Sequence, residues 1–150
     1  MIKKFIVQYR RNPWLIAAWV FYCLMIVLGS FRFLERGFVM TFNDKLLHFF
    51  AYAVLASLIF WGLKFPILQR LLATLSLVAV MGMVDEYLQN FTGRDPSFDD
   101  WLADMSGGIL SLICIFFLKL VIWLWRVARS GDWRQAMIQL VQPRDFDEET

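Results

Sequence analysis

The chain has 150 residues, of which 59% are apolar and 19% are charged, and its formal net charge is +2. The apolar share and the positive mean hydropathy exceed those of an ordinary soluble domain. No nucleic-acid-binding motif accompanies the basic residues, so the composition gives no support to a nucleic-acid partner. It favours a membrane protein instead.

The apolar residues fall into four blocks, each close to the roughly 20 residues with which a helix crosses about 30 Å of hydrocarbon. The blocks are residues 14–31, 46–63, 67–84 and 105–125. They predict membrane-spanning helices over about 13–31, 45–63, 67–89 and 98–126. We therefore expect an all-α polytopic membrane protein, a four-helix transmembrane bundle with short loops that forms one domain over residues 1–150.

Basic side chains are distributed unevenly along the chain. They precede the first block, lie between the second and third, and follow the fourth, whereas the other two loops are rich in acids. By the positive-inside rule, both termini are expected to be cytoplasmic, including a tail over residues 130–150, and both acidic loops are expected outside. The first block has no small-residue cleavage site after it, which predicts a retained signal anchor.

Both cysteines fall inside apolar blocks. Cys23 lies in the middle of the first block and Cys114 in the middle of the last. This placement predicts buried free thiols and no disulfide framework.

Capping residues mark two of the helix starts. Asn12 is expected to cap a helix that begins at Pro13. Proline lacks a backbone N–H, but at the first helical position this group would have no partner within the helix. Ser97 is followed three residues later by Asp100, which is typical of a capping box and predicts that the last helix begins at Phe98.

The last predicted helix carries small residues at every fourth position. Ala103, Gly107 and Ser111 form this stripe, and Gly108 adds a second small position. Such a stripe lets another helix approach closely, although it is common in membrane helices and carries no function by itself.

The second predicted helix opens with a polar face. Asp44, His48 and Tyr52 stand four residues apart, so they share one side of the helix near the outer membrane surface. Asp44 and Lys45 can equally be explained as helix-start residues, the acid favouring the macrodipole and the lysine reaching the interface. His48 is the only histidine and lies one turn deeper. We expect it to face the bundle and bond a carboxylate; the alternative is an inert packed imidazole.

More acidic residues lie at the end of the third helix and the start of the fourth. Asp85 and Glu86 oppose the macrodipole at a helix C-terminus, so they do not stabilise the helix locally and are expected to be functional. Gln89 lies one turn beyond Asp85. Asp100 can be explained as a dipole partner in the first turn of the fourth helix, whereas Asp104 lies one turn deeper and needs a partner.

In an up-and-down bundle with this topology, all of these groups meet at the outer membrane edge. This convergence follows from orientation and hydropathy alone. The predicted acid-base residues are His48, Asp85, Glu86 and Asp104, and the predicted substrate-binding residues are Asp44, Lys45, Tyr52, Gln89, Arg94 and Asp100.

Two stretches of the chain resemble the signature blocks of the VanZ-like family, small membrane proteins named after a teicoplanin-resistance protein. The stretches are DKLLHFFAY and DEYLQNFTGRDPSFDDWLADMSGG. They follow the pattern D-K-x-x-H-F-x-x-Y, then D-E-x-x-Q and G-R-x-x-S-x-x-D, across roughly the second to fourth predicted helices. The chain departs from the family at Asp104, where many members have Asn, at Leu88, where many have His, and at Ser111, where Gly is frequent.

The resemblance implies a location more than a chemistry. It implies a multi-pass protein of the bacterial inner membrane with its polar site on the extracytoplasmic side. It also implies a link to the cell envelope and, through the family's namesake, to tolerance of a glycopeptide antibiotic.

Two functions fit the predicted site. The first is binding of the polar part of a membrane lipid or a lipid-linked envelope precursor, with acids for ammonium or hydroxyl groups and Arg94 with Lys45 for phosphate or carboxylate. The second is a membrane-embedded hydrolase or transferase acting on a lipid head group. In it, His48 is the general base and is oriented by an acid such as Asp44 or Asp104. Asp85 or Glu86 is the second acid-base group, and Arg94 stabilises developing negative charge.

No metal and no other cofactor is predicted. One histidine, several carboxylates and no thiol at the site would suit Mg²⁺, Ca²⁺ or Mn²⁺ better than Zn²⁺, but the missing second histidine argues against a metal site. A transport path would need several copies of the chain, because four short spans without an internal repeat do not enclose one. The sequence is therefore compatible with a homo-oligomer without requiring one.

Overall fold

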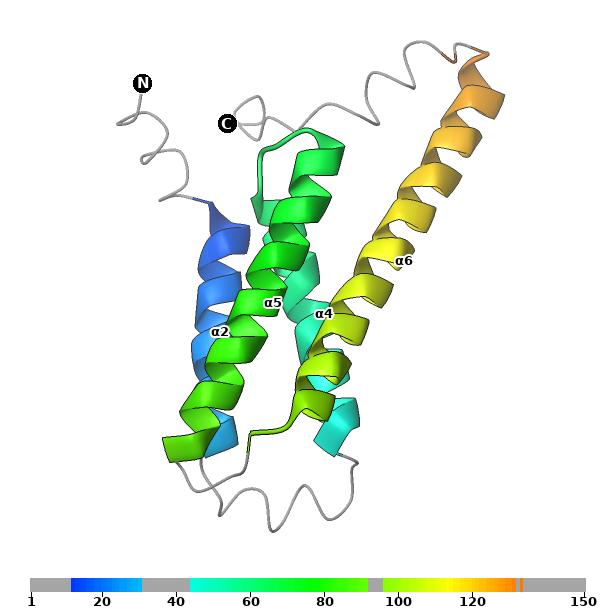
Figure 1. The fold of residues 1–150 in the computed structure, drawn as a ribbon. Coiled ribbons are helices and arrows are strands. Elements are labelled where there is room, and N and C mark those ends of the chain that lie inside the picture. The colour runs from blue at the N-terminus through cyan, green and yellow to red at the C-terminus, as the bar shows by residue number, and fades with distance from the viewer. Residues whose placement is uncertain (1–11, 31–43, 92–95, 132, 134–150) are drawn as a thin grey trace.

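A computed structural model describes residues 12–30, 44–91, 96–131 and 133, and this part of the chain contains four helices and no strand (Figure 1). The helices are α2 (Pro13–Ser30), α4 (Asp44–Gly62), α5 (Ile67–Phe91) and α6 (Phe98–Ser130). The predicted all-α bundle is confirmed, and each helix begins within one residue of its predicted start. The last helix is longer than predicted, because it continues to Ser130 and ends at a left-handed Gly131.

Three of the helices, α4, α5 and α6, are long and apolar enough to cross a membrane, and α2 is a shorter apolar helix. Their outward faces carry large apolar side chains, which would be unfavourable in water over so large an area. The pattern is that of a helical membrane protein, in which the outward faces contact lipid and the polar groups turn inward.

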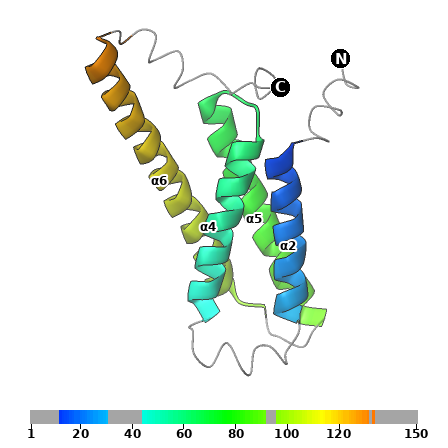
Figure 2. The ribbon, with the colours of Figure 1, turned by 180° about the vertical axis from the view of Figure 1, so that it is seen from behind.

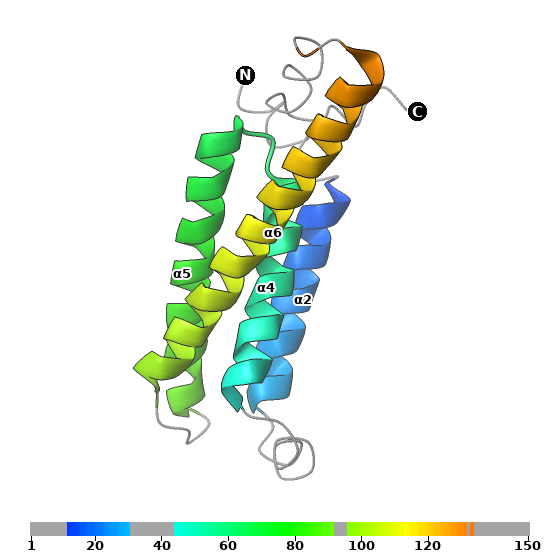
Figure 3. The same cartoon turned by 90° about the vertical axis from the view of Figure 1, so that its right-hand side faces the viewer.

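Helix α4 is the central element of the bundle, with α2 packed on one side and α6 on the other (Figures 1 and 2). The start of α4, the end of α5 and the start of α6 all lie at the same end of the bundle. The first half of α6 packs against α4 and α5, whereas its second half leans away from the other helices (Figure 1). Seen from the side, α6 crosses in front of α4 (Figure 3).

The apolar core follows α4 through the bundle. Tyr52, Leu55 and Ala56 of α4 are fully buried, and Val78 of α5 packs with them. A second cluster joins Phe60 of α4 to the middle of α6. Because α4 supplies more of the buried apolar side chains than any other described helix, the other helices are positioned relative to it.

The small-residue stripe of α6 lies against α4, as a close-contact surface should. A Cβ atom added at Gly107 would overlap the backbone carbonyl of Phe49. One turn further along α6, the hydroxyls of Ser111 and Ser57 are 2.7 Å apart. The glycine therefore sets how near the two helix backbones can lie.

The predicted cap of the first helix is confirmed at the other end of the bundle. The Asn12 side-chain oxygen accepts hydrogen bonds from the backbone N–H groups of Trp14 and Leu15. Its amide donates to the Gly62 carbonyl at 2.6 Å, which joins the start of α2 to the end of α4.

The cysteine prediction is half right. Cys23 and Cys114 are free, as expected, but both are exposed on the surface of the bundle. Each lies on a helix face that is turned away from the other helices, a position the sequence alone does not distinguish from a buried one.

We predict that Gly107→Ala destabilises the fold by about 2 kcal/mol, because the added methyl group forces α4 and α6 apart. The matched control is Gly29→Ala in α2, where an added Cβ meets nothing within 4 Å. That change should be neutral or slightly stabilising, since alanine has the higher helix propensity. Unfolding of both purified variants in detergent measures the difference, and equal stability would contradict the proposed close contact.

Candidate functional site

Six polar side chains are buried at the end of the bundle where α4 begins, α5 ends and α6 begins. They come from three different helices and belong to one cluster. The cluster consists of His48 from α4, Asp85, Glu86 and Gln89 from α5, and Asp100 and Asp104 from α6. The structure thus brings together groups that are far apart in the sequence, while their functional roles remain predictions.

The centre of the cluster is the contact between His48 and Asp104. The imidazole Nδ1 and the carboxylate Oδ1 are 2.9 Å apart, and both side chains are buried. The sequence left Asp44 and Asp104 open as partners of this histidine, and the short contact is with Asp104. The pair lies beside the close approach of Gly107 to Phe49, so the same backbone spacing that joins α4 to α6 allows the contact.

Glu86 joins the end of α5 to the start of α6. Its Oε2 accepts a 2.7 Å hydrogen bond from the backbone N–H of Ser97, and the Ser97 hydroxyl accepts one from the backbone N–H of Asp100. The predicted serine cap is confirmed, but the reciprocal acceptor of a capping box is Glu86 and not Asp100. The Asp100 side chain is one methylene shorter than the glutamate of a typical box, and Glu86 supplies the acceptor from the neighbouring helix.

Tyrosine hydroxyls and a tryptophan indole join the helices near the cluster, and one of these bonds reaches a cluster residue. Tyr52 donates to Asp85 Oδ2 at 3.4 Å, and Tyr22 donates to the Met81 carbonyl at 2.8 Å. The Trp101 indole donates to the Ala79 carbonyl at 3.1 Å, which fixes α6 against α5. Sequence reasoning missed Trp101; the signal was an indole N–H in an apolar helix, which requires a hydrogen-bond acceptor.

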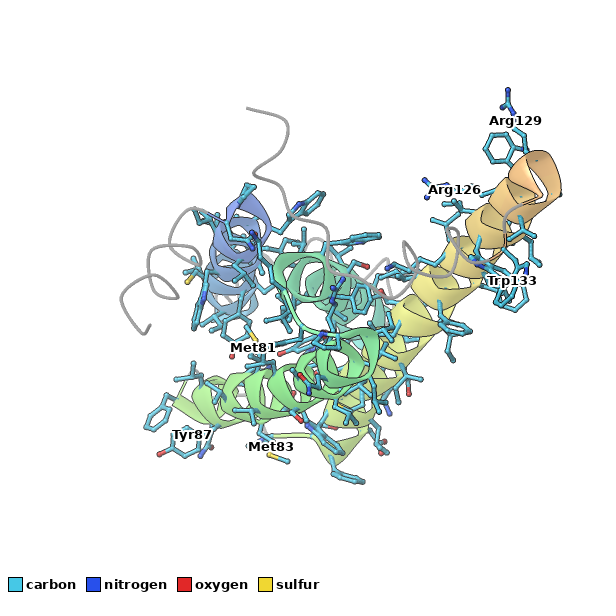
Figure 4. All side chains as sticks on the ribbon, turned by 90° about the horizontal axis from the view of Figure 1, so that it is seen from above. Met81, Met83, Tyr87, Arg126, Arg129 and Trp133 are labelled. Carbon is cyan, nitrogen blue, oxygen red and sulfur yellow. The ribbon has the colours of Figure 1, made fainter. Side chains whose placement is uncertain are left out.

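Side chains on α5 show which of its faces belongs to the bundle. Figure 4 shows Met81 on the side of α5 that faces α2, whereas Met83 and Tyr87 point outward. Asp85, Glu86 and Gln89 are buried, and Tyr87 between them is exposed. The polar residues of this helix therefore face the other helices.

The predicted lysine lies at the rim of the cluster. Lys45 Nζ is 2.7 Å from Asp99 Oδ2, and both side chains are more than half exposed, at 51% and 66%. Asp44, beside it, is partly exposed. Arg94 lies outside the described residues.

Two groups of side chains at this end could hold a metal ion. One is Asp44, His48 and Asp100, and the other is His48, Glu86 and Asp104; in each, the three ligand atoms lie within 4.8 Å of one another. Both groups combine one imidazole nitrogen with two carboxylate oxygens. The cluster can thus bind a cation or a polar group, or exchange a proton through the imidazole.

No family model, curated protein sequence or solved structure matches this chain. The resemblance to the VanZ-like family therefore still depends on the two sequence blocks that contain the cluster.

We predict that Glu86→Ala destabilises the protein by about 2 kcal/mol, because the Ser97 N–H loses a charged acceptor. Glu86→Gln keeps an oxygen in the same place and should cost less than half as much. Hydrogen exchange of the backbone amides at the start of α6 tests the cause. Exchange should accelerate in the alanine variant only, and equal exchange in both variants would contradict a capping role for Glu86.

Proposed function

We propose that this protein is a multi-pass protein of the bacterial inner membrane, related to the VanZ-like family, that binds the polar head group of a membrane lipid or lipid-linked envelope precursor. The observation that carries the proposal is the buried cluster of six polar side chains at one end of an apolar bundle. Burying so many polar groups in a membrane is unfavourable, so such a cluster is expected to bind a ligand or take part in a reaction.

The charge at the opposite end of the bundle supports an extracytoplasmic location for the cluster. Lys64 lies in the loop between α4 and α5, and Arg70 lies near the start of α5. Arg126 and Arg129 lie near the end of α6 (Figure 4). The positive-inside rule assigns these basic residues to the cytoplasmic side. The cluster, at the other end, then faces the outer leaflet.

The residues at the cluster favour a head group that carries both charges. Carboxylates of the buried cluster suit an ammonium or hydroxyl group, and Lys45 at the exposed rim suits a phosphate. Arg94, four residues before the start of α6, is proposed as a second phosphate contact. A zwitterionic phospholipid such as phosphatidylethanolamine has both of these features.

We predict that Asp85→Asn lowers the occupancy of bound phosphatidylethanolamine at least about tenfold, because an amide no longer pairs with the ammonium group. Native mass spectrometry of protein purified from bilayers of phosphatidylethanolamine and phosphatidylglycerol measures the occupancy. The matched control is Asp99→Asn, which removes the same charge from an exposed position of α6. Equal lipid occupancy in the wild type and in Asp85→Asn would remove the proposal.

A second candidate function is a hydrolase or transferase that acts on the head group. The short contact between His48 and Asp104 favours it, because a carboxylate that orients an imidazole is a common feature of general-base catalysis. Glu86 or Asp85 would be the second acid-base group.

We predict that, if the protein is an enzyme, His48→Ala slows head-group release by at least about 100-fold while bound lipid is retained. Release of phosphorylated or amino head group from the same bilayers, followed by chromatography, measures the rate. Absence of turnover in the wild type would leave binding as the function.

A further inference from the structure

Two carboxylate oxygens in the cluster accept no hydrogen bond. They are Glu86 Oε1 and Asp104 Oδ2. Glu86 is 7% exposed and Asp104 is fully buried, so bulk solvent does not reach either carboxylate. A buried charged acceptor left unsatisfied is strongly unfavourable, and such an atom requires an explanation.

The two residues share one small space with His48. The ligand atoms of His48, Glu86 and Asp104 lie within 4.8 Å of one another, and all three side chains are buried. Ligands on opposite sides of a divalent cation, with bonds of about 2.0–2.4 Å, are separated by up to about 4.8 Å. The three atoms therefore fit within a single coordination shell.

The separation of His48 from Asp104 fits the same arrangement. Adjacent ligands of an octahedral cation, at a right angle and with bonds of about 2.1 Å, lie about 3 Å apart. The Nδ1 to Oδ1 distance is 2.9 Å. This distance suits two ligands of a shared cation as well as it suits a hydrogen bond. A carboxylate that binds through both oxygens would bring the unsatisfied Oδ2 of Asp104 to the same ion.

We infer that His48, Glu86 and Asp104 form a divalent-cation site that joins α4, α5 and α6 within the membrane bundle. One imidazole nitrogen with two carboxylate oxygens is a mixed donor set, between the all-oxygen shells of Mg²⁺ and the nitrogen- and sulfur-rich shells of Zn²⁺. Mn²⁺ accepts both donor types and is the cation we assign.

The charge of the cluster supports a bound cation. Glu86 and Asp104 are buried close to one imidazole, while the described lysine at this end is directed to the exposed Asp99. Carboxylates that stay ionised in a low-dielectric interior require a compensating charge, and a divalent cation supplies two positive charges.

The surroundings hold the proposed ligands in place. The Ser97 N–H bonds Glu86 Oε2, which orients this carboxylate and leaves Oε1 available. Gly82 faces Asp104 Oδ2, and a Cβ there would lie only 2.9 Å from that oxygen. The glycine thus provides space beside the second unsatisfied oxygen.

In the other candidate group, Asp44 is partly exposed and accessible to water, which is why the inference is placed on Glu86 and Asp104.

Electron paramagnetic resonance with Mn²⁺ alone tests the site on the full chain in detergent, purified without a histidine tag and without added lipid. We expect one Mn²⁺ per chain with a Kd below about 100 μM. Electron spin echo modulation should show a directly bound nitrogen, and His48 is the only histidine that could supply it. Binding weaker than about 1 mM, or a spectrum without nitrogen coupling, would overturn the site.

Matched variants show whether these side chains hold the ion. Glu86→Gln keeps an acceptor for Ser97, and it should weaken Mn²⁺ binding at least about tenfold, as should Asp104→Asn. Asp99→Asn should bind as the wild type does, since this acid is exposed on the rim. Equal affinity in all three variants would mean general attraction to acids and would refute the assignment.

A variant that does not fold is replaced by His48→Asn, and the nitrogen signal of the wild type decides independently. Lipid binding plays no part in these measurements, so the site and the proposed function can fail separately.

Discussion

The close contact between α4 and α6 is the constraint on which the rest of the structure depends. Gly107 leaves no side chain between its backbone and the Phe49 carbonyl, so the two helices lie nearly in backbone contact at this point. The hydroxyl pair of Ser57 and Ser111 continues the contact toward the middle of the bundle. In lipid, helices gain little from burying apolar surface against one another, and packing of small residues is a principal source of association. The same spacing places Asp104 within 2.9 Å of His48, so the packing surface and the polar cluster are parts of one arrangement.

The third helix is held to this pair through polar groups as well as through apolar packing. Glu86 accepts from Ser97 at the start of α6, and the Trp101 indole donates to the Ala79 carbonyl of α5. Both bonds cross from one helix to the other near the polar cluster. Buried hydrogen bonds between membrane helices are worth only about 1 kcal/mol each, but they fix the rotation of each helix about its axis. Rotation decides whether an acid faces the bundle or the lipid, which explains how α5 keeps Glu86 buried while the adjacent Tyr87 is exposed.

The sequence was sufficient to predict the helices and the end of the bundle at which the polar residues meet. Hydropathy and the caps at Asn12 and Ser97 determine where helices begin, and both are local properties of the chain. The sequence did not reveal which groups pair. The histidine had two candidate acids, and the acceptor for Ser97 turned out to be on another helix, because such choices depend on helix rotation and interhelix distance. The exposure of Cys23 and Cys114 was unpredictable for the same reason. Uniformly apolar helices give no strong signal of which face turns inward.

The occupancy of the cation site would determine which part of a head group the cluster attracts. Without a cation, the buried carboxylates favour an ammonium or hydroxyl group, and a phosphate is repelled except near Lys45 at the rim. With a divalent ion held by His48, Glu86 and Asp104, two negative charges are offset and the open positions of the ion favour phosphate or carboxylate oxygens. The ion would also supply an activated water, which the hydrolase alternative needs because the Ser97 hydroxyl is engaged in capping. Catalysis at this site would therefore require a bound cation, whereas binding of an ammonium group would not. The preference of the site for ammonium or for phosphate groups would then show whether the cation is bound.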